Sequence, residues 1–267
     1  MKRLLSCMLV AVFLMFPAAS SALPGIDIEA AVGGWRQTPA GDLSYVSGVY
    51  NIEDTLDLEN DFGFEEETRV TGRLKLELPI VPNIYVVAAP MDFEGVGEKS
   101  VGFEFGDTRF EAGYPISSKL TLNQYDIGLY YGIPFLKTAT LGKLNIDLGV
   151  NVRILDINAE VSGRTIDPTT LAVISETRSK SIMAPIPMLY LAAQFKPIDR
   201  FAVEVEARGI STGDDKIYSL VGRVKVKVLG PAFVAGGYRY DVIKVDEEDV
   251  IVDTTFSGPF LEAGVQF

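Results

Sequence analysis

The stretch GPFLEAGVQF, residues 258–267, ends the chain on an alternating pattern and an aromatic side chain. Successive side chains of a β-strand point to opposite faces, so residues two apart share a face. One face of this strand would carry apolar side chains only, namely Leu261, Ala263, Val265 and Phe267. The end of the chain therefore predicts a strand with one apolar face and one mixed face.

The same alternation recurs along the whole chain. In the stretch LVGRVKVKV, for example, Val224 and Val226 alternate with Arg223, Lys225 and Lys227. We count ten such segments, at residues 26–37, 68–80, 83–95, 118–133, 141–160, 176–196, 200–212, 216–229, 231–244 and 252–267. Pro90, Pro185 and Pro187 fall inside the third and sixth segments, where a proline has no N–H to donate to a ladder.

The first 22 residues have the features of an export signal. Lys2 and Arg3 precede a largely apolar stretch at residues 4–16, and small residues follow up to Ala22. This order is typical of a cleaved secretory signal peptide, and the apolar stretch is too short for a membrane-spanning helix. We therefore expect residues 1–22 to be removed and residues 23–267 to form a single domain.

Composition points to a membrane environment. The chain carries a net charge of −12, which argues against a nucleic-acid partner, and its one cysteine, Cys7, lies in the predicted signal. Its mean hydropathy is nevertheless positive. No uninterrupted apolar run of about 18 residues follows the signal, so the apolar residues are spread by alternation, as in a transmembrane β-barrel.

Short and long connections alternate along the chain. Short ones fall at residues 79–83, 196–199 and 229–231, and long ones at 38–67 and 96–117. Outer-membrane barrels have short periplasmic turns and longer outer loops. We predict an antiparallel up-and-down transmembrane β-barrel of about ten strands, with eight or twelve as alternatives. We expect an aromatic girdle near the short turns, formed by Tyr85, Tyr131, Phe195, Phe201 and Phe267, and Tyr218 and Tyr240 near the opposite rim.

The last ten residues resemble the C-terminal recognition signal of bacterial outer-membrane barrels, and the acidic segment 54–68 is similar to one in small barrels of the broad OmpW-like group. The resemblance implies a Gram-negative outer-membrane protein. It would contact membrane lipid, engage the assembly machinery through its last strand and act as a monomer. We expect no cofactor and no nucleic-acid partner.

The faces predicted to point inward carry charges of both signs. Glu204 and Glu206 lie on the strand next to that of Arg223 and Lys225, so cross-strand ion pairs are expected. The predicted lumen charges are Arg73, Lys75, Glu77, Glu204, Glu206, Arg208, Arg223, Lys225, Lys227, Arg239 and Glu262. They predict either a cross-linked plug or a narrow pore that selects solutes.

These features favour a non-catalytic surface or envelope-integrity protein, with a small-solute diffusion channel as the alternative. An enzyme is disfavoured because the chain has no histidine. The carboxylates of Asp57, Glu59 and Asp61 are spaced as in calcium loops, but Phe62 and Thr68 break that pattern. Residues 38–67 are therefore expected to be a solvated acidic loop.

A soluble barrel with an apolar inside and a charged outside is the remaining alternative for the fold. The placement of the charges distinguishes it from a membrane barrel. On the membrane interpretation, Val226→Arg is expected to impair assembly more than Lys225→Ser, because a charge facing lipid is costly.

Overall fold

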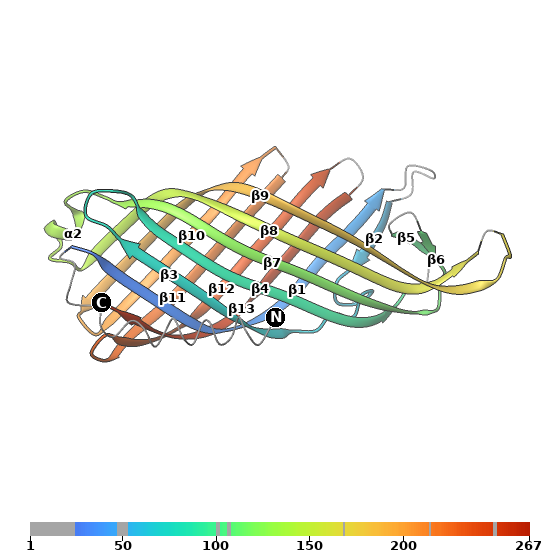
Figure 1. Ribbon diagram of the computed structural model, residues 1–267, viewed down its shortest axis with the longest axis horizontal. Coiled ribbons are helices and arrows are strands. Elements are labelled where there is room, and N and C mark those ends of the chain that lie inside the picture. The colour runs from blue at the N-terminus through green and yellow to red at the C-terminus, as the bar shows by residue number, and fades with distance from the viewer. Residues whose placement is uncertain are drawn as a thin grey trace.

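The computed structural model describes residues 25–46, 53–99, 102–105, 108–167, 169–213, 215–247 and 250–267. The predicted signal peptide and its cleavage site lie outside these ranges. The described residues form one closed barrel, shown from the side in Figure 1.

Ten antiparallel strands build the barrel, as predicted, and each pairs with the next along the chain. The strands are β1 (Asp27–Val46), β3 (Glu67–Glu77), β4 (Asn83–Glu98), β7 (Pro115–Gly132), β8 (Leu144–Ile166), β9 (Val173–Ile198), β10 (Phe201–Thr212), β11 (Asp215–Leu229), β12 (Ala232–Glu247) and β13 (Val250–Gln266). Closure between β13 and β1 completes the ring, so every strand is paired on both sides over part of its length. At this seam the Ile28 N–H donates to the Phe267 carbonyl at 3.2 Å, and the Phe267 N–H donates back at 3.0 Å.

The two ends of the barrel differ. Short connections and the one-turn helix α2 (Leu136–Ala139) lie at the end where the C-terminus is marked in Figure 1. We call this the short-turn end. The opposite end carries β2 (Glu53–Asp57), the small hairpin of β5 (Phe103–Phe105) and β6 (Thr108–Phe110), and the long β8–β9 hairpin. Parts of the predicted loops 38–67 and 96–117 are thus strand, because β1 continues its pairing with β13 as far as Tyr45.

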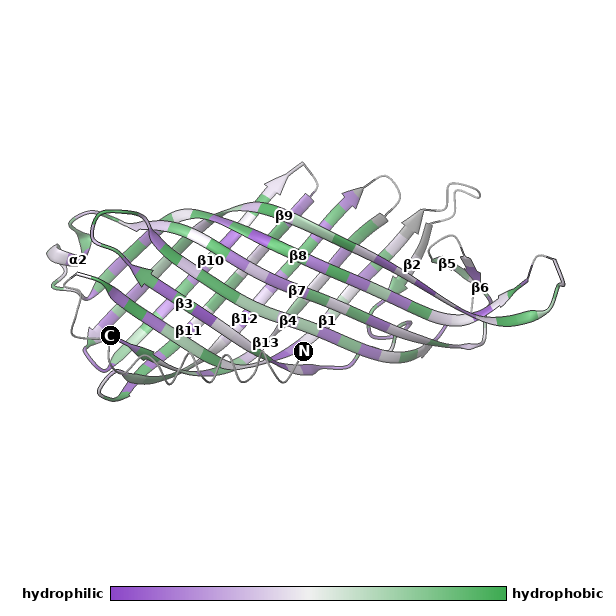
Figure 2. Cartoon of the chain, in the orientation of Figure 1, coloured by the Kyte–Doolittle hydropathy of each residue, from purple (hydrophilic) through white to green (hydrophobic). Residues whose placement is uncertain are grey.

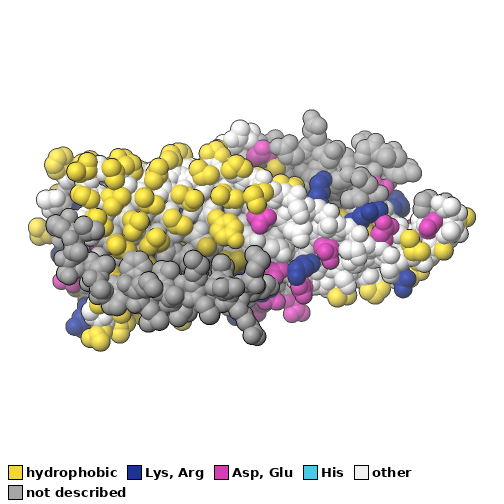
Figure 3. Space-filling model, viewed as in Figure 1, with side chains coloured by type: hydrophobic (Ala, Val, Ile, Leu, Met, Phe, Trp, Pro, Cys, Tyr) yellow, Lys and Arg dark blue, Asp and Glu magenta, His cyan; other side chains and the backbone are white. Residues whose placement is uncertain are grey.

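The outside of the barrel is apolar over the half nearer the short-turn end. Figure 3 shows hydrophobic side chains covering this half and charged side chains beginning beyond it. Leu129, Val150 and Leu261 belong to the apolar half, which we call the apolar band, and are 46%, 57% and 69% exposed. Exposed aliphatic side chains at this density match a lipid-facing surface. None of the helices in the described ranges is long and apolar enough to cross a membrane.

Beyond the apolar band the two faces of the sheet exchange character. Figure 2 shows the succession of hydrophilic and hydrophobic positions along the strands. On β7, inward Asp126 and Gln124 give way to inward Leu122, while outward Ile127 and Tyr125 give way to outward Asn123 and Lys119. The exchange on β8 lies at the same height: outward Ile154 is followed by outward Asp156, and inward Arg153 by inward Leu155. We call the side of this level that faces the short-turn end 'below' and the other side 'above'. The barrel is therefore polar inside and apolar outside below this level, and apolar inside and polar outside above it.

Two expectations about single residues are corrected or refined. Tyr85 does not join an outer girdle: it pairs in register with Lys75, points inward and is 1% exposed. Strand β9 does run through Pro185 and Pro187, where it pairs with β8. Its ladder with β10 covers residues 189–198 only, and Pro187 precedes Leu189 by two residues, so the prolines lie where β9 has only one neighbour among the described strands.

Candidate functional site

The inward side chains at the height of the apolar band form a compact layer of charge. Strand alternation places them inside, and barrel closure brings residues of distant strands together. The layer, which we call the ionic layer, contains six acids and seven bases, so its net charge is small. Its members are Glu29, Asp126, Glu204, Glu206, Asp241, Glu262, Arg73, Lys75, Arg153, Arg208, Arg223, Lys225 and Arg239.

One part of the ionic layer crosses the barrel between β1, β3 and β11. The Lys225 Nζ lies 2.7 Å from a carboxylate oxygen of Glu29 and 2.7 Å from one of Glu204. Arg73 pairs with Glu29 at 2.5 Å and with Glu262 at 2.7 Å. These side chains are 8% exposed or less, so each charge is compensated by a partner rather than by bulk water.

A second part is centred on Glu206. Its carboxylate accepts from Arg208 and Arg223, each at 2.6 Å, and from the Tyr85 hydroxyl at 2.8 Å. Lys75 approaches the same group at 3.3 Å. The expected cross-strand pairs between β10 and β11 are therefore present, and Glu206 also reaches β3 and β4.

The third part lies closest to the level where the faces exchange. Asp126 binds Arg153 through two bonds of 2.9 Å, and both side chains are fully buried. Arg239 pairs with Asp241 at 2.7 Å and lies over the Trp35 ring, 4.4 Å from its centroid. Paired charges and aromatic rings thus fill the lumen here.

Two of the predicted lumen charges lie outside the ionic layer. Glu77 is at the short-turn end, where Lys137 of α2 donates to it at 3.1 Å. Lys227 is half-buried near the turn between β11 and β12. A polar cavity of about 190 Å³ lies between the short-turn end of the barrel and the ionic layer. We call it the vestibule; its lining includes Asp27, Glu77 and Lys196.

Sequence reasoning missed the contribution of tyrosines to the layer. The Tyr85 and Tyr190 rings lie 5.7 Å apart, and the Arg208 guanidinium lies 4.8 Å from the centroid of Tyr85. The short connection between β3 and β4 holds the signal that places Tyr85. It fixes Tyr85 opposite Lys75, and directly paired residues share a face.

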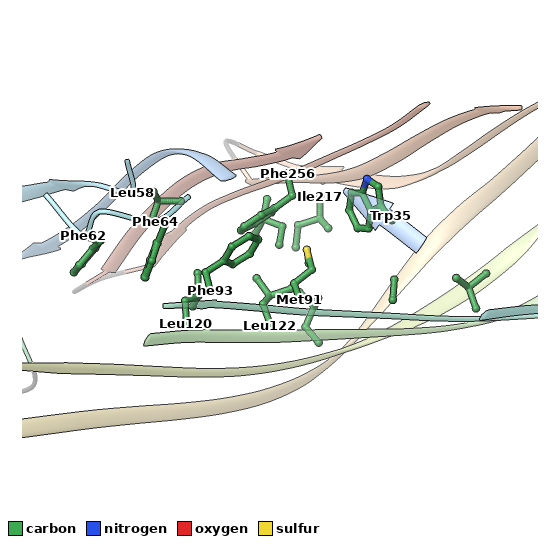
Figure 4. Packing of buried hydrophobic residues seen from close by; sticks show 14 of the residues in the cluster. Trp35, Leu58, Phe62, Phe64, Met91, Phe93, Leu120, Leu122, Ile217 and Phe256 are labelled. Atoms are coloured by element: carbon green, nitrogen blue, oxygen red, sulfur yellow. The ribbon is translucent and has the colours of Figure 1, made fainter. Parts of the chain in front are cut away.

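Above the ionic layer the barrel interior is apolar. Figure 4 shows side chains from opposite walls meeting there, with Phe93 of β4 stacked on Phe256 of β13 at 5.7 Å between centroids. We call this the apolar layer. Its most buried members, each 6% exposed or less, include Leu56, Leu58, Phe62, Phe64, Met91, Phe93, Leu120, Leu122 and Phe256.

The segment after β2 folds into the mouth of the barrel. Leu58, Phe62 and Phe64 point into the apolar layer, and Phe64 forms an isolated bridge with Gly95 of β4. A Cβ on Gly95 would lie 2.4 Å from backbone oxygens of this segment, so only glycine permits the approach. Several carboxylates of the predicted acidic loop are exposed, as expected, but its apolar residues form a plug that the prediction lacked.

The calcium-like spacing has a different explanation. The Asp57 carboxylate accepts from the backbone N–H groups of Glu59 and Asn60, at 2.9 and 2.6 Å, which closes a tight turn. Within the described ranges, no group of three or more acidic or cysteine side chains is arranged to hold a metal ion.

Comparisons with known proteins place the fold. No protein-family model matches the chain, and no curated protein matches it either. Among solved structures, the outer membrane protease OmpT from Escherichia coli superposes with a TM-score of 0.54 at 9% identity, covering 93% of this chain and 99% of that one. Ail, the attachment invasion locus protein of Yersinia pestis, gives 0.35 at 13% identity over 90% and 98%. Neisserial surface protein A gives 0.33 at 9% identity over 91% and 97%.

The chain thus has the fold of a Gram-negative outer-membrane β-barrel. At 9% identity the likeness to OmpT is one of architecture alone, and it carries no residue of the protease to this chain.

Proposed function

We propose that this protein is a non-catalytic component of the Gram-negative outer membrane that acts at the cell surface. The short-turn end lies in the periplasm and the β8–β9 hairpin outside the cell. The observation that carries the proposal is the length of the outer wall. Strands β8 and β9 have 23 and 26 residues, whereas about 9–11 suffice to cross the membrane.

This outer wall has a surface suited to water. Outward Glu94 of β4 binds Lys119 of β7, and outward Asn123 of β7 donates to Asp156 of β8 at 3.3 Å. The β8–β9 ladder continues to the pair Ile166 and Val173, so the hairpin keeps its β-structure far from the band. An extended polar wall is a surface for contact with other molecules of the envelope or its surroundings.

The interior supports a role other than catalysis. Its charged groups are held in mutual ion pairs, and the chain has no histidine to act as a general base. The apolar layer then closes the outer half of the lumen.

The wall can be tested by shortening it. Because Ser162 pairs with Thr177, residues 163–176 can be replaced by a two-residue turn without changing the register below. A strain lacking the protein should become more permeable to large antibiotics. The intact chain should restore the barrier, and the shortened chain should fold but fail to restore it.

The matched control is Leu171→Ser, which keeps the hairpin length and changes an exposed tip residue. Folding is checked by the shift in gel mobility on heating. Full restoration of the barrier by a folded, shortened barrel contradicts the surface role.

A small-solute channel is the second candidate, and the vestibule favours it because it is a polar space inside the barrel. Single-channel recording in a planar bilayer tests it, with Lys196→Glu and Lys227→Glu together as the variant. Both lysines lie toward the short-turn end and outside the ionic layer. Openings whose ion selectivity shifts in the variant support a channel, whereas a silent, folded barrel supports the surface role.

Several finer assignments are part of this proposal. They are membership of the OmpW-like group, contact with membrane lipid, the monomeric state, and recognition of Leu261, Ala263, Val265 and Phe267 by the assembly machinery. The apolar band and the position of Phe267 at the closing seam support the lipid contact and the C-terminal signal.

A further inference from the structure

The apolar layer encloses a cavity of about 150 Å³ that the surface role does not use. Its walls come from opposite sides of the barrel and include Leu43 of β1, Leu122 of β7, Ile157 of β8 and Phe256 of β13. Phe62 of the folded-in segment covers part of it. Apolar cavities of this size do not hold water well, and an engineered one of about 150 Å³ binds benzene.

The cavity is blind toward the periplasm. Below Leu122 the next inward residue of β7 is Gln124, whose amide oxygen accepts from Arg239 at 2.7 Å. The ionic layer begins there, and a hydrocarbon group passing through it would have to break buried ion pairs. A ligand that enters from outside is therefore held rather than passed on.

The barrel wall is low on one side of the cavity. The ladder between β9 and β10 ends at the pair Leu189 and Gly209, and β10 itself ends at Thr212. Ile182 faces inward and lines the cavity, yet it is 51% exposed because β8 is the only described strand that pairs with β9 at this height. The inward Ile210, at the end of β10, is 38% exposed.

The outer surface beside this gap between β9 and β10 is itself apolar. On the outer face of β9, Leu189 is 73% exposed and Met183 is 69% exposed, and Pro185 and Pro187 lie between them. Exposed apolar side chains of β9 thus extend from the apolar band to the edge of the cavity. The position, at the outer edge of the band, is where membrane acyl chains and dissolved apolar molecules both arrive.

We infer that the cavity is a binding site for a hydrocarbon group, which enters over the β10–β11 hairpin. The group is an acyl chain of a neighbouring lipid or a small apolar molecule. Burial of each methylene strengthens binding about fourfold. Affinity should therefore rise with chain length until the cavity is filled. This site is independent of the surface role, because its walls exclude the β8–β9 tip that the role requires.

The experiment uses contact quenching of a tryptophan placed in the cavity wall. Trp35 is the only tryptophan, so a Trp35→Phe, Phe256→Trp protein carries a single indole beside the cavity. It is refolded into vesicles. One arm adds 1-bromohexane to plain vesicles, and the other uses phospholipid with brominated acyl chains.

Quenching is expected in at least one arm, and the arm identifies the source of the hydrocarbon. A Trp35→Phe, Ile127→Trp protein is the control that the quencher is present, because Ile127 faces lipid and is 49% exposed. Adding Ala159→Phe to the reporter fills the cavity and should weaken quenching at least tenfold.

If Phe256→Trp does not fold, Phe62→Trp carries the reporter on the opposite wall. A folded reporter that neither quencher reaches, while the Ile127→Trp control is quenched, overturns the inference. Quenching that survives Ala159→Phe unchanged overturns it as well.

Discussion

Replacing Lys225 by methionine removes a charge from the middle of the ionic layer with little change in volume. Lys225 is 2% exposed and bonds two carboxylates at once, Glu29 and Glu204, each at 2.7 Å. Its Nζ also lies over Phe233, 5.4 Å from the ring centroid. Methionine has a similar volume and no charge, so the measured effect reports on the contacts of the ammonium group, chiefly its two ion pairs.

The expected cost follows from what the two carboxylates retain. Removal of one partner of a buried ion pair destabilises by about 3–5 kcal/mol, since the remaining charge stays buried. Glu29 keeps Arg73, and Glu204 keeps Arg223 at 3.2 Å, so the lower end of that range applies. We expect about 3 kcal/mol, roughly a 150-fold fall in the folding equilibrium constant.

Equilibrium urea unfolding in lipid vesicles, followed by Trp35 fluorescence, measures this cost. The matched control is Lys227→Met on the same face of β11, which forms no ion pair with the described residues and should change stability by less than about 0.5 kcal/mol. Adding Glu204→Gln to Lys225→Met should recover part of the loss, because a buried charge is removed along with its partner. If Lys225→Met unfolds within about 1 kcal/mol of the unchanged protein, the layer does not cross-link the barrel as argued.

Three further predictions test other parts of the structure. Val224→Arg places a charge near the middle of the apolar band and should cost about 2–4 kcal/mol of stability in the same unfolding assay. Val226→Arg lies two residues nearer the turn and should cost less. Equal costs for the two variants would contradict the depth assigned to β11. Phe64→Ala removes a ring from the plug and should cost about 3–5 kcal/mol, and a stability unchanged within error would show that the plug does not hold the barrel mouth. Deletion of Phe267 should lower the fraction of newly made chains that reach the membrane, as measured by heat-shifted mobility, and undiminished assembly would count against the C-terminal signal.

Local alternation was sufficient to predict the ten strands because the two-residue period depends only on neighbouring side chains. It also placed most of the lumen charges inside. The stability cost of a substitution within the ionic layer, by contrast, could be estimated only from the structure. On the sequence alone Val226→Arg is expected to be worse than Lys225→Ser, and that order stays a prediction; the buried ion pairs of Lys225 add a cost to Lys225→Ser that alternation did not indicate.

What alternation did not supply is the set of partners across the lumen. Glu29 and Lys225 are 196 positions apart, on strands that are not neighbours in the sheet. Their contact depends on how the barrel closes, and no pattern within either strand encodes it. The plug was missed for a related reason. Its acidic residues dominate the composition of residues 54–68, while Leu58, Phe62 and Phe64 supply the packing.

The exchange of faces along β7 and β8 explains how two interpretations of one sequence were both open. Side chains point alternately inward and outward along the whole of each strand. On β8, however, the apolar residues are the outward ones before Asp156 and the inward ones after it. The membrane barrel accounts for the first part. The soluble barrel, apolar inside and charged outside, describes the second.

In each of these two parts of the barrel, the outward side chains suit the surroundings and the inward side chains pair with one another. On the proposed placement of the apolar band in the membrane, lipid surrounds the sheet at this height, and the ion pairs inside are strong because the local dielectric constant is low. Beyond the band, water surrounds the sheet, and burying Phe93 and Phe256 inside stabilises it as in an ordinary soluble domain. The same strands can therefore extend beyond the proposed membrane region without a separate domain. Because the inside of the barrel changes from polar to apolar where the surroundings change, the apolar cavity lies directly above the closed ionic layer.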